Sequence, residues 1–203
     1  MSTLVCARWN PPVSSTLADL EGVWNDLFSA RDFSVRLGAA FLVSPYDYTL
    51  LDALSTAALT RYARSFTTGV RERLKVHVED ALNVDEKEMH ERFMAIRNKH
   101  VAHPVNLFET HAINVGFCEE DPPNARATVV STGTRTSIGL TLGEAMAIKA
   151  LCETWPAYVR VLMKKEEERL LTYAQQLTAS ELLALPRGPV EPQDDPEKRR
   201  TRQ

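Results

Sequence analysis

The sequence has few cysteines, and those present are poorly placed for cross-linking or metal binding. Only Cys6, Cys118 and Cys152 occur among 203 residues. They are odd in number, far apart and never in a Cys-x-x-Cys pair, whereas disulfide frameworks and zinc knuckles need paired cysteines at short spacings. The sequence therefore predicts a protein of a reducing compartment without a disulfide framework.

Long uncharged apolar runs and an excess of positive charge are also missing. The first twelve residues include Arg8 and Trp9 but no apolar core of a signal peptide, and no run is long enough to cross a bilayer. The formal net charge of −3 excludes a protein that coats nucleic acid through bulk positive potential. We expect a cytoplasmic protein with no membrane contact, in which any contact with RNA is local.

The apolar content of 44% is enough for one domain with a substantial core. Apolar residues recur at helical spacing in four segments. These segments run from about Leu17 to Ser44-Pro45, from about Tyr46 towards Gly69 and beyond, from Asn83 to His103-Pro104, and from about Thr141 to Leu177. Pro156 should kink or break the last helix. Trp24, Phe28, Phe93 and Trp155 are predicted to lie in the core, and His77 and His90 on the surface.

A different pattern separates the third and fourth helices. Three short β-prone runs between about residues 111 and 140 are divided by Asp121-Pro122-Pro123-Asn124 and by Thr132-Gly133-Thr134, which predicts a small antiparallel meander. Beyond Pro186 the chain is rich in proline and charge, which is typical of a disordered tail. The predicted organisation is one helical domain over residues 1–185, with a β insertion at about 111–140, and a charged tail over 186–203.

A cluster of cationic and imidazole side chains occurs in the third predicted helix. Arg97, His100 and His103 fall within seven residues, and both histidines continue a helical stripe that begins at the apolar Phe93. Polar groups on an inward-facing stripe need partners. Hydrogen bonding of the histidines to nearby carbonyl groups is the plainest of three interpretations.

A zinc site is the second interpretation, in which His90, His111 or Cys118 would join His100 and His103. The chain has no His-Glu-x-x-His arrangement and no cysteine pair to complete four ligands. We therefore expect no metal and no cofactor.

RNA cleavage without a metal is the third interpretation. A base removes the proton of the 2′-hydroxyl, that oxygen attacks the adjacent phosphate, and a cation balances the developing charge. Histidine suits the proton transfer and arginine suits the phosphate. On a continuous helix Arg97 and His103 lie about 120° apart and about 9 Å along the axis. A two-fold pair of such helices would bring Arg97 of one subunit towards His103 of the other.

The run Arg97-Asn98, four further residues and His103 resembles the signature of the HEPN superfamily (higher eukaryotes and prokaryotes nucleotide-binding domains). That signature is an arginine, a polar residue, and a histidine four to six positions after the arginine. The fuller run Arg-Asn-Lys-His-Val-Ala-His is similar to versions in HEPN proteins related to abortive infection. The resemblance covers about Leu17 to Leu177 and implies a mainly α, HEPN-like helical bundle. The β-meander before the long last helix departs from the plainest form of that fold.

The resemblance implies a metal-independent endoribonuclease that works as a homodimer with its site between the subunits. Arg97 would stabilise the scissile phosphate, Asn98 would orient the site, and His103 would transfer the proton. RNA and a second copy are the implied partners, and a toxin or phage-defence component restrained by an antitoxin or regulatory protein is the implied setting. The alternative is a non-catalytic HEPN-like interaction or nucleotide-binding module in which the same residues only hold the dimer.

Two further residues are candidates for substrate binding. His100 has no fixed counterpart in the short motif and is interpreted as a second proton-transfer group or as packing. Arg64, with Arg61 and Arg71, would extend a phosphate track along the second predicted helix. A solvated or ion-paired helix face is the favoured interpretation of these three arginines.

Overall fold

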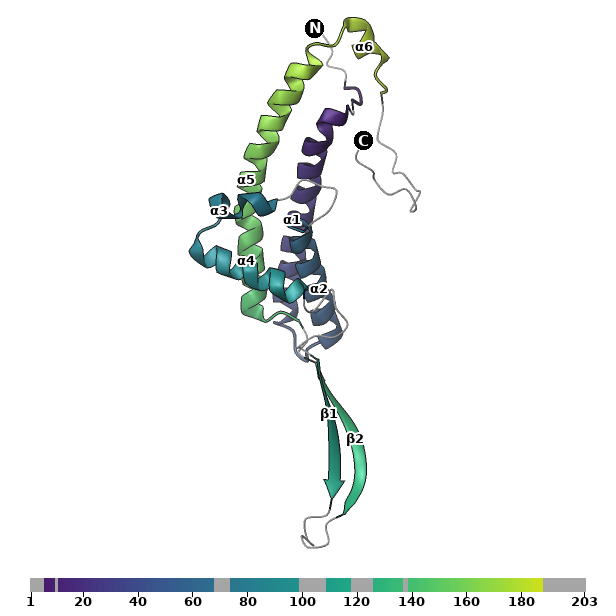
Figure 1. Ribbon diagram of the computed structural model, residues 1–203, viewed down its shortest axis with the longest axis vertical. Helices are drawn as coiled ribbons and strands as arrows, with labels where there is room; N and C mark the ends of the chain where they lie inside the picture. Colours follow the sequence, from purple (N-terminus) through teal and green to yellow (C-terminus); the bar gives the residue numbers. More distant parts are fainter. Residues whose placement is uncertain are drawn as a thin grey trace.

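The computed structural model describes residues 6–9, 11–67, 74–98, 109–117, 126–136 and 139–187. They form a mainly helical body and a two-stranded antiparallel sheet. In Figure 1 the sheet projects from one end of the helices and extends the molecule along its longest axis. The predicted fold class, mainly α with a small β insertion before a long helix, is confirmed.

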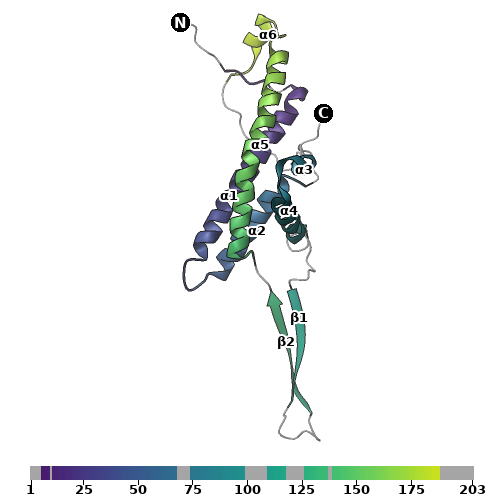
Figure 2. The ribbon, with the colours of Figure 1, turned by 90° about the vertical axis from the view of Figure 1, so that its left-hand side faces the viewer.

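Three long helices form the centre of the body. They are α1 (Ser15–Ala40), α2 (Tyr48–Arg64) and α5 (Leu142–Ala174). Helix α1 packs against both of the others, and the three lie side by side in Figures 1 and 2. Helices were predicted in all three regions, which is confirmed. A break at Pro156 was wrong, because α5 continues through this residue.

The core lies where these helices meet α4 (Val84–Ile96). The largest fully buried side chains include Trp155, Tyr62, Phe66, Phe93, Leu27 and Leu37. Burial of each such side chain contributes about 1.5–3 kcal/mol relative to its exposure to water. These contacts therefore supply most of the stability of the body.

The predicted core aromatics are only partly correct. Trp155 and Phe93 are fully buried, and Trp24 is partly buried against the core. Phe28 was wrongly placed in the core, since 53% of it is exposed. It lies one position, about 100° of helix rotation, from the buried Leu27.

Polar side chains fix where the helices begin. Asp47 accepts a hydrogen bond from the backbone N–H of Leu50 at the start of α2. Helices α4, α5 and α6 (Ala179–Ala184) each begin with a capping box, in which the cap residue and the glutamate three positions later bond each other's backbone. In α5 this box joins Thr141 and Glu144.

Short elements connect the long helices. They are the 3-10 helices η1 (Pro12–Ser14) and η2 (Leu74–His77), and the single turn α3 (Val78–Ala81). The second predicted helix was expected to reach Gly69 and beyond, but α2 ends at Arg64. The short helix α6 was not predicted, and residues 188–203, most of the predicted tail, lie outside the described part of the chain.

The sheet is a hairpin of two long strands. Strand β1 (Glu109–Phe117) pairs antiparallel with β2 (Ala127–Thr136), in a register that sets Val115 opposite Val130 and contains a bulge beside Phe117. Three β-prone runs were predicted, but the third forms no separate strand in the described residues. The division predicted at Thr132-Gly133-Thr134 is wrong, because these residues lie within β2. The first residue of the third run, Thr136, ends β2, and Gly139 and Leu140 lie in the turn before α5.

No helix in the described ranges is both long enough and apolar enough to span a bilayer.

Candidate functional site

Helix α4 positions the first two residues of the predicted motif. Its start is fixed by Asn83, whose side chain accepts from the backbone of Glu86, and its centre is anchored by the fully buried Phe93. Arg97 is the C-cap residue. A cation at this position interacts favourably with the negative end of the helix dipole.

Arg97 and Asn98 contact each other at the end of α4. Nη1 of Arg97 donates to Oδ1 of Asn98 at 3.1 Å. Nε of Arg97 is buried and has no hydrogen-bond partner, and within the described ranges no carboxylate lies within ion-pair distance of this guanidinium. An arginine has five donors, so this side chain is left with donors that no described protein acceptor satisfies.

The backbone changes its geometry at these two residues. Helix α4 ends at Ile96, and Arg97 and Asn98 form a π-helical turn. The spacing of His103 relative to Arg97 stays a prediction, because residues 99–103 lie outside the described part of the chain. Single π-helical turns occur frequently at functional sites.

The structure brings together two of the predicted site residues, Arg97 and Asn98. His100 and His103 lie outside the described residues, as does Arg71. Their predicted roles in proton transfer and substrate binding stay predictions.

Arg64 belongs to an ion-paired cluster between α1 and α2. Asp26, which is almost fully buried, lies 2.8 Å from Nη1 of Arg61 and 3.2 Å from Nε of Arg64. The ion-paired interpretation of this helix face is therefore confirmed for Arg61 and Arg64. Both arginine side chains remain more than 40% exposed, so part of each guanidinium still faces water.

His90 was wrongly predicted to lie on the surface. It is buried, its Nδ1 lies 2.9 Å from the hydroxyl of Tyr62, and its ring packs edge-on against Phe66. Burial lowers the pKa of His90 to about 4. The histidine is therefore neutral at pH 7 and acts as a core hydrogen-bonding group.

A helical repeat in the sequence would have predicted that His90 is buried. Residues 90, 93 and 97 are three and four positions apart, and they give a buried histidine, a buried phenylalanine and a half-buried arginine. The predicted inward-facing stripe ran from Phe93 through Ile96 to the two later histidines. It therefore followed the neighbouring face of the helix and left out His90. His77 is half-buried, and its Nδ1 lies 3.2 Å from the Tyr158 hydroxyl.

The side chains suited to metal binding do not gather in the part of the chain that the structure describes. No three His, Cys, Asp or Glu side chains there form a group that would hold a metal. His90 is engaged by Tyr62, and burial raises the pKa of the Cys152 thiol to about 12. Cys118 lies outside the described residues, and Cys6 is exposed.

Comparison with known proteins assigns no family. No family model, curated protein or solved structure matches this chain.

Proposed function

We propose that this protein is a HEPN-like, metal-independent endoribonuclease that acts in the cytoplasm as a homodimer. The observation that carries the proposal is the state of Arg97, whose guanidinium is held by Asn98 but has no carboxylate partner among the described residues. A phosphate accepts paired hydrogen bonds from such a fork. The proposed partners are RNA, a second copy, and an antitoxin or regulatory protein that restrains the activity.

The proposed reaction is an internal transfer at phosphorus. His103 takes the proton of the 2′-hydroxyl, whose oxygen then bonds to the adjacent phosphorus as the bond to the 5′-oxygen breaks. The departing 5′-oxygen gains a proton, and the products are a 2′,3′-cyclic phosphate and a 5′-hydroxyl. Arg97 stabilises the charge that develops on the phosphoryl oxygens.

The remaining motif residues have supporting roles in this proposal. Asn98 orients the guanidinium through its 3.1 Å hydrogen bond. His100 and Arg64 are proposed to bind the RNA substrate. In this proposal His103 of the second copy acts on the phosphate that Arg97 binds.

The test is cleavage of total RNA by the purified full chain in the presence of a chelator. Arg97→Ala should lower the rate about 100-fold or more, and His103→Ala by about 100-fold or more. Arg92→Ala is the matched control, because Arg92 lies on the same helix but is ion-paired with Glu144 at 2.6 Å. This variant should keep most of the activity.

Three results would contradict the proposal. The first is absence of cleavage under any condition while the chain is folded and dimeric, which is what the non-catalytic module predicts. The second is wild-type activity in Arg97→Ala. The third is activity that the chelator removes.

A further inference from the structure

The β-hairpin is a projecting arm with one apolar face. We call β1 and β2 together the arm. Ile113, Val115 and Phe117 alternate along β1 and so share a face with Val130, the partner of Val115. Their exposed fractions are 67%, 52%, 61% and 65%. Figures 1 and 2 show the arm extending away from the helices, so no described helix covers this face.

An arm of this kind needs a partner surface. A two-stranded hairpin alone is at best marginally stable in water. The arm has no charged side chain among those described over residues 112–117 and 127–133. Nucleic acid binding depends on cations that neutralise phosphates. This part of the arm therefore suits an apolar protein surface and not RNA.

The helical body has an exposed apolar surface of matching character. We call it the seam, because it follows the junction of α1 and α5. Its members have exposed fractions between 42% and 81%: Phe28, Val35, Leu42, Leu142 and Met146. A Cβ built on Gly38 would lie 3.8 Å from Cδ1 of Leu142 and 4.0 Å from Sδ of Met146, so the two helices lie close together here.

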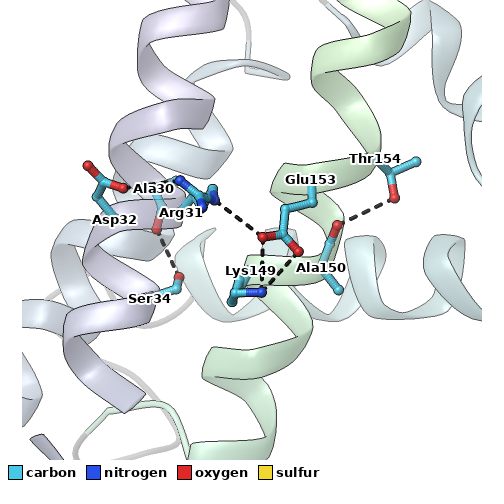
Figure 3. Close-up of polar contacts among 8 residues, drawn as sticks. All are labelled: Ala30, Arg31, Asp32, Ser34, Lys149, Ala150, Glu153 and Thr154. Carbon is cyan, nitrogen blue, oxygen red and sulfur yellow. Dashed lines mark hydrogen bonds and ion pairs between the residues drawn. The ribbon is translucent and has the colours of Figure 1, made fainter. Parts of the chain in front are cut away.

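The charged groups of the seam cancel one another. Figure 3 shows Nε of Arg31 bonded to Glu153 at 3.3 Å, and Lys149 bonded to the same carboxylate at 3.0 Å. Asp32 lies 3.5 Å from Arg31. These two cations and two anions sum to zero, so this part of the seam presents no net charge to a partner.

Arm and seam start from the same end of the body and run in opposite directions. Helix α1 ends and α5 begins at this end, where the arm also starts (Figure 1). A nine-residue strand spans about 30 Å. The 14 steps from Phe28 to Leu42, two residues beyond the end of α1, rise about 21 Å at helical geometry. A two-fold axis near the start of the arm would therefore lay the arm of each copy along the seam of the other.

Symmetry also doubles the buried area. The seam limits the contact to about 21 Å by 10 Å, or about 210 Å², so one arm on one seam buries about 420 Å² in total. A two-fold pair forms this contact twice and buries about 840 Å², which is the size of a weak interface. A different protein that met only the arm would bury half as much.

We propose that the arm of one copy binds the α1–α5 seam of a second copy, and that two such reciprocal contacts hold the protein as a dimer. Arg97 precedes the arm by only twelve positions. Exchange of arms would therefore place the motif ends of both copies near the two-fold axis. The exchanged dimer itself does not depend on RNA cleavage.

The experiment measures the mass of the full chain in solution by light scattering or sedimentation, without RNA. The wild type should be a dimer, and Val115→Glu on the arm or Val35→Lys on the seam should each weaken the dimer at least tenfold. Asn114→Glu is the matched control, because it places the same charge on the opposite face of the same strand. It should leave the dimer intact.

Mixing the two variants provides the sharpest comparison. Val115→Glu and Val35→Lys chains combined in equal amounts should form a mixed dimer, because one of its two contacts is wild type and the other pairs Glu with Lys. A monomeric wild type overturns the proposal. So does a Val115→Glu chain that stays dimeric. If Val115→Glu dissociates the dimer but Val35→Lys does not, the arms bind each other or another surface, and the seam is not their site.

Failure of arm exchange and failure of the proposed nuclease activity give different results. A chain that dimerises through arm and seam but cleaves no RNA contradicts only the nuclease. A chain that cleaves RNA while Val115→Glu remains dimeric contradicts only the arm exchange. Arg97→Ala should leave the mass unchanged in either case.

Discussion

The helical body and the arm use apolar side chains in opposite ways. In the body, Trp155, Tyr62 and Phe93 are fully buried by neighbouring helices, whereas Ile113 and Val130 of the arm are mostly exposed. The body thus buries its apolar side chains within one chain, whereas those of the arm stay accessible to another protein surface. Substitutions that separate the stability of the body from the association of the arm test this difference.

Truncation in the core should give the largest effect. Trp155→Ala removes a fully buried indole and should lower the free energy of unfolding by about 4 kcal/mol. Denaturant unfolding followed by helical circular dichroism measures the change. Ile113→Ala on the arm, measured at low protein concentration, should shift the same transition little. Equal losses in the two variants would show that body and arm unfold as one unit.

The buried histidine should make the body sensitive to acid. Burial lowers the pKa of His90 to about 4, so the unfolded chain, in which the pKa is near 6.5, binds the proton more readily. Stability from this group is fully present above about pH 6.5 and falls as the pH drops towards 4, by up to about 3 kcal/mol. Unfolding free energies at a series of pH values measure this loss.

His90→Phe is the control for that pH dependence. The variant loses the hydrogen bond with Tyr62 and should be less stable at pH 7, but its stability should change less between pH 6.5 and 4. Parallel curves for the variant and the wild type would mean that other groups cause the acid sensitivity.

A smaller effect is expected at the turn that joins arm and body. Gly139 has a φ of +80°, and an added Cβ would lie 2.8 Å from Oγ of Ser55, which accepts from the backbone N–H of Leu140. Gly139→Ala should cost about 2 kcal/mol, because an L side chain is strained at this φ and displaces Ser55. The unfolding transition of the body reports the loss.

Gly116→Ala in the arm is the control for Gly139→Ala in the turn. An added Cβ there would lie 2.6 Å from Cγ1 of Val129, but this valine is 57% exposed and has room to rotate. Its effect on the body should be negligible. A loss as large as that of Gly139→Ala would mean that the arm stabilises the body within one chain.

The smallest effect should come from the exposed ion pairs of the seam. Hydrogen bonds from Lys149 and Arg31 lower the pKa of Glu153, yet exposed pairs of this kind contribute little to folding because water and salt screen them. Glu153→Gln should leave the unfolding transition of the body unchanged. A clear shift at low salt would show that this network helps to hold α1 against α5.

The long helices could be predicted from sequence because local signals coincide there. Apolar spacing, the Asn83 cap and the Thr141 capping box all indicate the helices that form. Which side chains of a helix are buried was harder to predict. Leu27 and Phe28 are neighbours in the sequence, and only tertiary packing decides which one faces the core. The end of α2 was missed because helical propensity continues past Arg64, where the chain turns away.

The candidate site could be predicted only in part. The pairing of Arg97 with Asn98 follows from adjacent positions at a helix end, and Arg64 has the carboxylate partner that an arginine face typically finds. That partner, Asp26, lies 38 positions away from Arg64 in the sequence. The packing of α1 on α2 brings the two residues together. Such long-range contacts have no local signal.

One carboxylate links the two helices that precede and follow the arm in the sequence. Glu144 accepts from the backbone N–H of Thr141 at 2.8 Å and from Nη2 of Arg92 at 2.6 Å, and so links the first turn of α5 to α4, the helix that precedes β1 in the chain. Burial alone would raise the pKa of Glu144, but these hydrogen bonds outweigh it, and the lowered pKa keeps the group ionised at neutral pH. The two helices that precede and follow the hairpin in the sequence are therefore linked by one ionised side chain. Because the pKa of Glu144 is lowered, this link should persist until the solution is acidic enough to protonate the carboxylate.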